Sequence, residues 1–344
     1  MATKKTPIAV FGTDSHLKKD NEELVTSCFE QVKALMLEMR INTFCHGGDF
    51  FTTRNAQPEA SLRAAKKIFN LFIDDEEDLD FYQIPGNHDK TELDSENSYL
   101  DVFDRYCNLV KGYNHLDLKG VRIHFIPYFK EDGSYKDYLK KATQNIDKTL
   151  KNVLLTHIAV SGVKNNDGSE VENTLTSKLF AKFDNVFVGH YHNRSTIGEN
   201  IHYIGSMFAG NYGEDNEKGV VVLYDDASFE YFQLEFPHYI KITVEPGDKD
   251  ALKKVRTEYK DTENHVRLIF KGERHKLDTV NKAELEEHGF DVKYQDETKI
   301  NQEQMVEGEL IIFNRSNLKE AFDTFCDSSG IVDKEKGKKY LEVI

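Results

Sequence analysis

Five short apolar runs in this 344-residue chain are each followed within two residues by a polar residue of a kind that binds metal ions. Short apolar runs bounded by turn residues are typical of buried strands. In an open α/β sheet, ligand-binding residues gather beyond the carboxyl ends of the strands. The order of the runs therefore predicts a sheet architecture that brings five strand ends to one crevice. The runs are PIAVFG (7–12), INTFC (41–45), FYQIP (81–85), NVLLT (152–156) and NVFVG (185–189).

Helical patterns separate the first three of these runs. In residues 21–40 the apolar residues recur at helical spacing, and Pro58 suits the first turn of a helix whose apolar face includes Ile68 and Phe69. Later runs follow one another more closely and predict strands at 121–129, 201–205, 219–224 and 229–236. We therefore predict an α/β fold, with mixed β-sheets flanked by helices.

A second pattern begins near Tyr239, where the chain reads β-α-β-α-β. We predict three regions: a main domain over 1–238, a small α/β domain over 239–296, and a linker with a helical C-terminal tail over 297–344. In the tail, an apolar stripe either packs on its own protein or docks a partner. The stripe consists of Leu318, Ala321, Phe322 and Phe325.

The formal net charge of -15 argues against general nucleic-acid binding. Contact with DNA would need a local basic patch, metal ions or a basic partner. The candidate basic residues are Arg54, Arg63, Lys66, Lys67, Lys164 and Arg194.

The cysteines and the apolar segments indicate a reducing compartment. The four cysteines include no C-x-x-C pair, and the chain has neither a secretory leader pattern nor a long apolar run. We therefore predict a cytoplasmic protein with no membrane partner.

The polar residues after the five runs suit a pair of metal ions. Nitrogen and oxygen ligands together fit manganese, iron or zinc. Seven candidates are too many for one tetrahedral centre, but they match two ions that share a carboxylate. Two ions roughly 3.5–4 Å apart can activate water and hold phosphate oxygens. Each motif alone is more often a turn, and only their occurrence together in order favours a site. The candidates are Asp14, His16, Asp49, Asn87, His157, His190 and His192.

His88 is left over from this ligand set. Its position predicts that it stabilises charge on the phosphate or protonates the leaving oxygen. We predict that Asp89 orients His88 as a supporting residue. The other histidines, among them His46, His115 and His124, are predicted to be structural or exposed.

These motifs resemble the calcineurin-like metallophosphoesterases, whose signature is D-x-H, G-D, G-N-H-D/E, H and G-H-x-H. They occur here as TDSH, GGD, PGNHD, THIAV and GHYH. The resemblance implies a four-layer sandwich, with His88 as the catalytic histidine and Asp49 as the bridge between two metals. It also implies two ligand sets, which are Asp14, His16 and His192 for one metal and Asn87, His157 and His190 for the other.

Within that superfamily the chain is most similar to the SbcD-type (Mre/Rad-type) recombination and repair nucleases, including bacteriophage forms. The similar segments lie within about residues 7–245 and include GGDFFTTRNAQPEASLRA, HYIGS and KGVVVLYDD. Lys18 and Thr52 depart from that pattern, which often has glycine and an acidic residue there.

The resemblance implies exonuclease action on duplex DNA ends and endonuclease action on single strands. It favours Mn²⁺, with Mg²⁺, Fe²⁺ and Zn²⁺ also fitting. It further implies a DNA-capping role for residues 239–296, a homodimer, and an SMC-like ATPase (SbcC-type) bound by C-terminal helices. A phage form would act in the host cytoplasm.

Two other functions fit the same fold. A small-molecule or nucleotide phosphodiesterase would use the same two metals. A scaffold without catalysis would show eroded ligands, and every ligand position of the signature is filled here.

Overall fold

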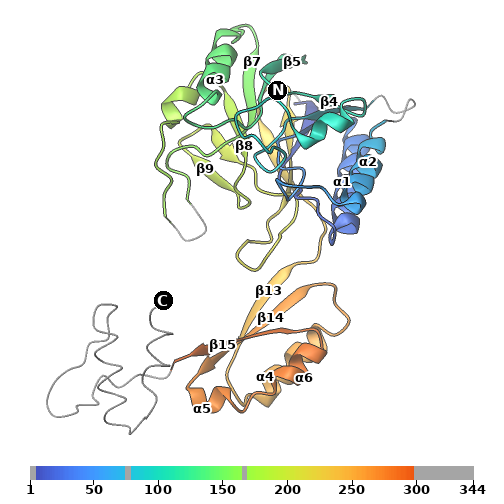
Figure 1. Ribbon diagram of the computed structural model, residues 1–344, viewed down its shortest axis with the longest axis vertical. Coiled ribbons are helices and arrows are strands. Elements are labelled where there is room, and N and C mark those ends of the chain that lie inside the picture. Colours follow the sequence, from blue (N-terminus) through green and yellow to red (C-terminus); the bar gives the residue numbers. More distant parts are fainter. Residues whose placement is uncertain (1–4, 74–78, 165–168, 298–344) are drawn as a thin grey trace, which may run out of the picture.

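The structure is a computed structural model that describes residues 5–73, 79–164 and 169–297 (Figure 1). Its strands form two six-stranded sheets and one three-stranded sheet. The tail predicted over 297–344, with its apolar stripe, lies outside the described residues except for Glu297.

The first sheet contains four of its strands in parallel. β1, β2, β3 and β4 run the same way, so their carboxyl ends meet at one edge, while β11 lies antiparallel to β1. The strand order is β12-β11-β1-β2-β3-β4. The bounds are β1 (Pro7–Gly12), β2 (Thr43–His46), β3 (Asp80–Gln83), β4 (Asn108–Leu109), β11 (Gly219–Tyr224) and β12 (Phe229–Gln233).

The second sheet has the order β5-β6-β7-β8-β10-β9. Its central strands β6, β7, β8 and β10 are parallel, and its two edge strands β5 and β9 are antiparallel. The bounds are β5 (Asn114–Leu118), β6 (Val121–Ile126), β7 (Lys151–His157), β8 (Asn185–Gly189), β9 (Ser195–Ile197) and β10 (Ile201–Tyr203).

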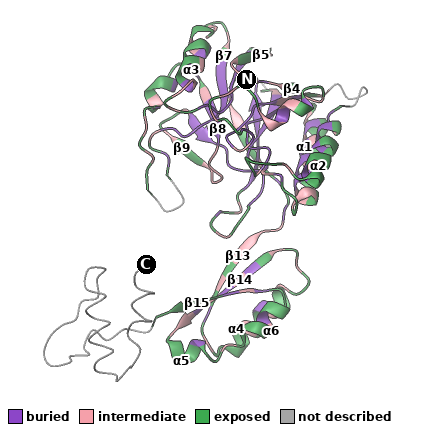
Figure 2. Ribbon diagram, viewed as in Figure 1, coloured by how far each residue is buried: buried purple, intermediate pink, exposed green. Residues whose placement is uncertain are grey.

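The two sheets face each other, and helices cover their outer sides. Because side chains alternate along a strand, Phe11 of β1 points between the sheets, where its ring lies 5.2 Å from that of Phe187, while Val10 packs beneath the helices. The buried layer between the sheets appears in Figure 2. These layers confirm the predicted fold class of mixed sheets flanked by helices.

Two helices lie over the first sheet and one over the second. In α1, Val25, Phe29, Val32 and Met36 are fully buried, which accounts for the helical spacing of the apolar residues. No described helix has the length and hydrophobicity that a membrane span requires. The bounds are α1 (Glu22–Met39), α2 (Glu59–Asn70) and α3 (Tyr135–Gln144), with 3-10 turns η1 (Tyr99–Phe103) and η2 (Ser177–Phe180).

The third sheet is parallel, in the order β13-β14-β15, and forms with its helices the small domain. Its core contains Leu268 and Phe270, both fully buried. Asp248 and Asn281 cap two of the helices, since each side chain accepts a backbone N–H three residues ahead. The bounds are β13 (Tyr239–Val244), α4 (Lys249–Glu258), β14 (His265–Gly272), α5 (Arg274–Leu277), α6 (Lys282–Glu287) and β15 (Asp291–Asp296).

Some elements differ from the sequence predictions. The strand predicted over 121–129 ends at Ile126, before Pro127, which lacks the N–H that would continue the ladder. Helix α3 was not predicted, because only Tyr135, Leu139 and Ala142 are buried in its lysine-rich segment.

We expect acid pH to destabilise the fold through His124. This ring is fully buried on β6 and contacts Asn152 Oδ1 at 3.2 Å. Burial lowers the pKa of His124 to about 4, against about 6.5 in an unfolded chain. Since the folded-state pKa is the lower one, the stabilising contribution is present above pH ~6.5 and is lost as pH falls toward 4, by up to ~1.4 kcal/mol per pH unit.

The check is urea unfolding at pH 7 and pH 5. The free energy of unfolding should fall less with acidification in His124→Gln than in the wild type. His275→Gln, which changes an exposed histidine, serves as the control. Equal pH dependence in all three proteins would contradict the assignment.

Candidate metal centre

The seven candidate ligands come from five loops at the carboxyl ends of strands in both large sheets. Asp14 and His16 follow β1, Asp49 follows β2, and Asn87 follows β3. From the facing sheet, His157 ends β7, and His190 and His192 follow β8. The structure brings all seven side chains together between the sheets.

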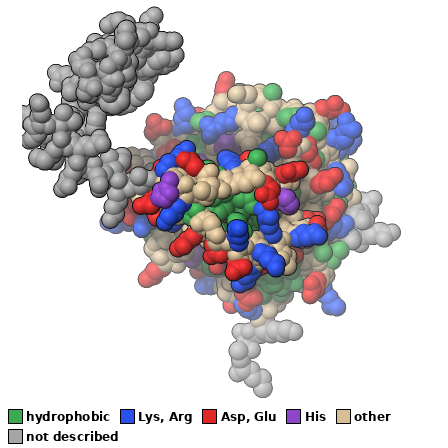
Figure 3. All heavy atoms as spheres, turned by 90° about the horizontal axis from the view of Figure 1, so that it is seen from below, with side chains coloured by type: hydrophobic (Ala, Val, Ile, Leu, Met, Phe, Trp, Pro, Cys, Tyr) green, Lys and Arg blue, Asp and Glu red, His purple; other side chains and the backbone are tan. Residues whose placement is uncertain are grey.

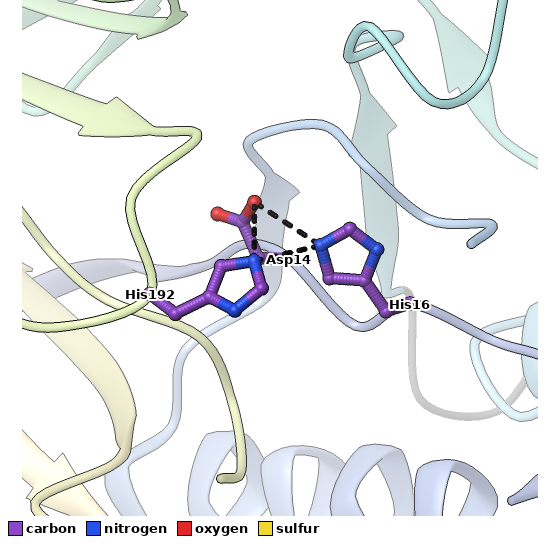
Figure 4. Close-up of side chains that lie close together, drawn as sticks. All are labelled: Asp14, His16 and His192. Atoms are coloured by element: carbon purple, nitrogen blue, oxygen red, sulfur yellow. Dashed lines mark hydrogen bonds and ion pairs between the residues drawn. The ribbon is translucent and has the colours of Figure 1, made fainter. Parts of the chain in front are cut away.

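The first triad consists of Asp14, His16 and His192, whose ligand atoms lie within 4.8 Å of one another (Figure 4). The Nε2 atoms of the two histidines are 2.9 Å apart. They lie 3.7 Å (His16) and 4.0 Å (His192) from Asp14 Oδ1. Two imidazole nitrogens and a carboxylate oxygen therefore converge on one point.

The second triad consists of Asp49, His157 and His190, again within 4.8 Å. Asn87 joins it, because its Oδ1 lies 3.1 Å from His157 Nε2 and 2.8 Å from His190 Nδ1. His190 thus presents Nδ1 where the other histidines present Nε2. The two oxygens and two nitrogens form a mixed set of the kind that divalent transition metals prefer.

Asp49 lies between the two triads. Its Oδ2 is 3.3 Å from His157 Nε2 in the second triad and 3.8 Å from His16 Nε2 in the first. A carboxylate within reach of both sets is placed as a bridging ligand would be.

Hydrogen bonds on the far side of two rings leave the inward nitrogens available. His157 Nδ1 lies 2.9 Å from the Gly47 carbonyl, and His192 Nδ1 lies 2.9 Å from Glu214 Oε1. Both partners are acceptors, so in the neutral form of each ring the proton resides on Nδ1 and the lone pair on Nε2. This tautomer is the one that binds a metal through Nε2, and the donor set therefore fits two divalent ions.

Four of the candidate ligands have positive φ angles, which are uncommon outside glycine. They are Asp14 (φ 54), His16 (φ 43), Asp49 (φ 52) and His190 (φ 91). Paired backbone bonds hold this strain, since Asp14 N donates to Gly48 O at 2.9 Å and His16 N donates to Asp49 O at 3.0 Å. Strained backbone gathered at one place is typical of functional sites.

Gly86 explains the Pro-Gly turn after β3. A Cβ at this position would lie 2.2 Å from both the backbone N and Oδ1 of Asp49. Only glycine lets the third loop approach the second closely enough for Asn87 to join the second triad.

The charges at the site favour ionised carboxylates on Asp14 and Asp49 and a protonated ring on His157. Burial would raise the pKa of Asp14 and Asp49, but His157 and the other histidines hold both pKa values well below their usual range. Burial would lower the pKa of His157, but Asp49 and Asp14 raise it to about 9. Burial lowers the pKa of His190 to about 4.

His88 stands beside the first triad. Its ring lies edge-on to that of His16, with centroids 5.1 Å apart, and its Nδ1 contacts the Thr52 carbonyl. Its backbone N donates to Asp49 Oδ1 at 2.7 Å. Burial lowers the pKa of His88, and the charge of Arg54 contributes to this.

The Asp89 carboxylate, which we predicted to orient His88, makes its hydrogen bonds to backbone groups. The Asp89 carboxylate is fully buried and accepts the backbone N–H groups of Gly86 (2.8 Å), Phe51 (2.9 Å) and Phe50 (3.2 Å). Asp89 therefore ties the second and third loops together, and the Thr52 carbonyl is the group that contacts the His88 ring. Burial and the nearby Asp49 charge raise the pKa of Asp89 to about 7.

Two neighbours of the site were missed at the sequence level. Glu214 contacts His192, and the ring of Tyr128 stacks on His190 with centroids 6.1 Å apart. Neither belongs to a spacing pattern, since each comes from a loop outside the five motifs.

Most of the candidate basic residues are engaged elsewhere. Arg63 pairs with Glu59, Lys67 lies 3.6 Å from Glu30, and the Arg194 guanidinium lies 4.2 Å from the ring of Tyr231. Lys66 lies 6.0 Å from the ring of Tyr106. Lys164 is exposed, and only its backbone pairs with Glu170. Arg54 is exposed and lies near His88.

We expect divalent metal to stabilise the protein measurably. An ion that binds only the folded state contributes about 2.7 kcal/mol at a hundred times its dissociation constant. For a domain of this size that raises the melting temperature by about 5–10 °C. Thermal unfolding in chelator, in Mn²⁺ and in potassium chloride of equal ionic strength is the measurement. Equal melting temperatures in Mn²⁺ and potassium chloride would contradict a metal centre.

Comparison with known proteins identifies the family of this chain. A family model described as calcineurin-like phosphoesterase matches residues 7–194. The SbcD component of the nuclease SbcCD from Staphylococcus epidermidis is 25% identical over 235 residues, covering 60% of each chain. The chain thus spans about three fifths of that relative.

A DNA double-strand break repair protein Mre11 from Saccharolobus solfataricus is 26% identical over 309 residues, covering 79% of this chain and 77% of the relative. Among solved structures, a dimetal phosphatase from Danio rerio is 12% identical, with a TM-score of 0.39, covering 63% of this chain and 93% of that one.

Proposed function

Because the chain belongs to the calcineurin-like phosphoesterase family, we propose that it is a two-metal phosphodiesterase whose substrate is DNA. The observation that carries this proposal is the pair of ligand triads that meet at Asp49, with His88 beside them. The proposed ligands are Asp14, His16 and His192 for one ion, Asn87, His157 and His190 for the other, and Asp49 for both. We propose Mn²⁺ as the metal.

The bound ions would supply an activated water and would withdraw charge from the phosphate oxygens. The residues of the chain perform the remaining tasks. Asp49 holds the backbone of His88 through its Oδ1, which fixes the ring relative to both triads. The Thr52 carbonyl accepts a hydrogen bond from the Nδ1–H of His88, which would leave Nε2 to face the substrate. Protonated Nε2 would then donate a proton to the leaving oxygen.

Two observations favour DNA over smaller phosphodiesters. The similarity to the Mre11 protein covers 79% of this chain, well beyond the residues 7–194 of the phosphoesterase match. In addition, residues 239–296 carry twelve Lys and Arg against thirteen Asp and Glu, so the small domain has little of the net charge of -15. Its end of the molecule shows Lys and Arg side chains among the acidic ones (Figure 3). We propose that this domain caps bound DNA.

The proposed partners follow from the same relatives. We propose that the protein forms a homodimer and acts in recombination or repair as the nuclease subunit of a complex with an SMC-like ATPase. The proposed contact is the segment 297–344, through its apolar stripe. Gel filtration of the protein alone and with the ATPase subunit, with Phe322→Glu as the variant, tests both points.

A nucleotide or small-molecule phosphodiesterase is the second candidate. It is favoured by the partners of three candidate basic side chains, since Arg63 pairs with Glu59, Lys67 lies near Glu30 and Arg194 lies on the ring of Tyr231. Its activity would need the same ligands and the same His88.

One assay separates the two. Purified protein with Mn²⁺ is given end-labelled linear duplex DNA, single-stranded DNA and bis-p-nitrophenyl phosphate, each with a chelator control. Metal-dependent shortening of the duplex and cutting of the single strand supports the nuclease. Turnover of the chromogenic diester with intact DNA supports the alternative, and no turnover of any substrate removes both.

A further inference from the structure

The ring of His192 contacts a carboxylate that lies outside the proposed ligand set. Its Nδ1 is 2.9 Å from Oε1 of Glu214, whose side chain is 2% exposed. Glu214 also accepts the backbone N–H of Gly210 at 3.1 Å and the side-chain amide of Asn211 at 2.7 Å. Three donors thus fix this carboxylate against one metal ligand.

Lys218 holds the backbone of the same histidine. Its ammonium group is fully buried, lies 3.5 Å from Glu214 Oε2, and donates to the His192 carbonyl. It also donates to Asn193 Oδ1 at 2.8 Å. Glu214 therefore fixes the ring of His192 while Lys218 fixes its main chain, and each buried charge compensates the other.

The proton position follows from this contact. A carboxylate beside a buried ammonium group can only accept a hydrogen bond, so the proton of His192 resides on Nδ1. The lone pair of Nε2 is then directed at Asp14 and His16, which lie 4.0 Å and 2.9 Å away. A carboxylate on the outer nitrogen of a ligating histidine also makes the ring a stronger ligand.

The other side of the same loop contacts the small domain. Asn216 forms two hydrogen bonds of 3.1 Å with the backbone of Tyr239, the first residue of β13. The ring of Tyr212 lies 4.9 Å from the ring of Tyr239 and 3.8 Å from the guanidinium of Arg267 on β14. One residue separates Tyr212 from Glu214, and one separates Glu214 from Asn216. The loop is therefore too short to absorb a movement between its contact with the small domain and its contact with His192.

We infer that the loop Gly210–Lys218 couples the first triad to the small domain, with Glu214 as the positioning residue for His192. The inference rests on the proposed metal centre and adds to it a physical connection. A shift of β13 would move Asn216 and Tyr212, and through Glu214 it would change the affinity of one of the two metal sites. A ligand bound to the small domain would thereby change the metal affinity of the first triad.

Manganese binding without DNA tests the positioning role. The full chain is titrated with Mn²⁺ by calorimetry, and the pair of ions is followed by electron paramagnetic resonance. In Glu214→Gln we expect one site to weaken by about 10–100-fold while the other is unchanged, so that the signal of a coupled pair gives way to that of single ions. Glu217→Gln removes an exposed charge three residues away and should bind as the wild type does.

Folding is checked in chelator, where Glu214→Gln should still unfold cooperatively, but at a lower temperature than the wild type, because the buried Lys218 loses the charge that compensates its own. If that variant fails to fold, Glu214→Asp keeps the charge but draws it back by one methylene, and the same loss at one site is expected. Two equal, wild-type sites in the folded variant would overturn the positioning role.

A separate variant tests the coupling between the first triad and the small domain. Asn216→Ala removes both bonds to Tyr239, and we expect it to weaken the same single site several-fold. Asn264→Ala is the matched control, since its side chain accepts the His238 N–H at 2.7 Å at the base of the small domain without touching the loop. Loss of affinity in both variants, or in neither, would overturn the coupling. Because no DNA is present, these outcomes are independent of whether the substrate is DNA.

Discussion

Replacing His88 with alanine is expected to lower phosphodiester turnover by about 10²–10⁴-fold, the range for loss of a general acid, and to leave both metal ions bound. The structure explains why turnover should fall while metal binding is retained. His88 lies edge-on to His16 and is oriented by the Thr52 carbonyl, while the two triads and Asn87 supply the donors without it.

Turnover of bis-p-nitrophenyl phosphate and of duplex DNA, together with Mn²⁺ titration, measures the two properties on one preparation. The diester carries a good leaving group that needs little protonation, so its turnover should fall less than that of DNA. His275→Ala, at an exposed site on the small domain, is the control. Unchanged cleavage of DNA by His88→Ala would remove the residue from its assigned role, and loss of metal would make it a ligand.

Replacing Asp49 with asparagine is expected to abolish paired metal binding and to reduce turnover further than any other single change. Loss of a supporting residue costs about 10–100-fold in metal affinity, and a ligand shared by two ions should cost at least the upper end of that range. The Asp49 carboxylate lies within 4 Å of histidine nitrogens in both triads. Its backbone amide also lies against Gly86, so an isosteric replacement is the appropriate one.

Metal analysis after dialysis and Mn²⁺ titration provide the readout. Asp49→Asn should also lose the thermal stabilisation by Mn²⁺ that the wild type shows. Asp250→Asn, which changes an exposed carboxylate on α4, should retain both the paired metal binding and the thermal stabilisation by Mn²⁺. Retention of two tightly bound ions in Asp49→Asn would show that the two triads bind metal independently and that no bridge exists.

Much of the fold was predictable from the apolar runs. The strands predicted over 185–189 and 219–224 have those bounds in β8 and β11, because strands that are buried on both faces are continuous apolar segments flanked by turns. Helix α3 and the edge strands β5 and β9 were not predictable in the same way. They bury fewer residues, so their apolar pattern is weak.

The sequence by itself determined which residues gather at the metal centre. Each lies at or shortly after the end of a strand, which places it at the carboxyl edge of a sheet. The packing of the two sheets then brings the two edges together. Only the tertiary structure decided which groups support them. Asp89 turns inward to three backbone amides, and Glu214 reaches His192 from a loop that no motif contains. Such contacts depend on the distance between loops that are remote in sequence, and that distance is set by the packing of the two sheets.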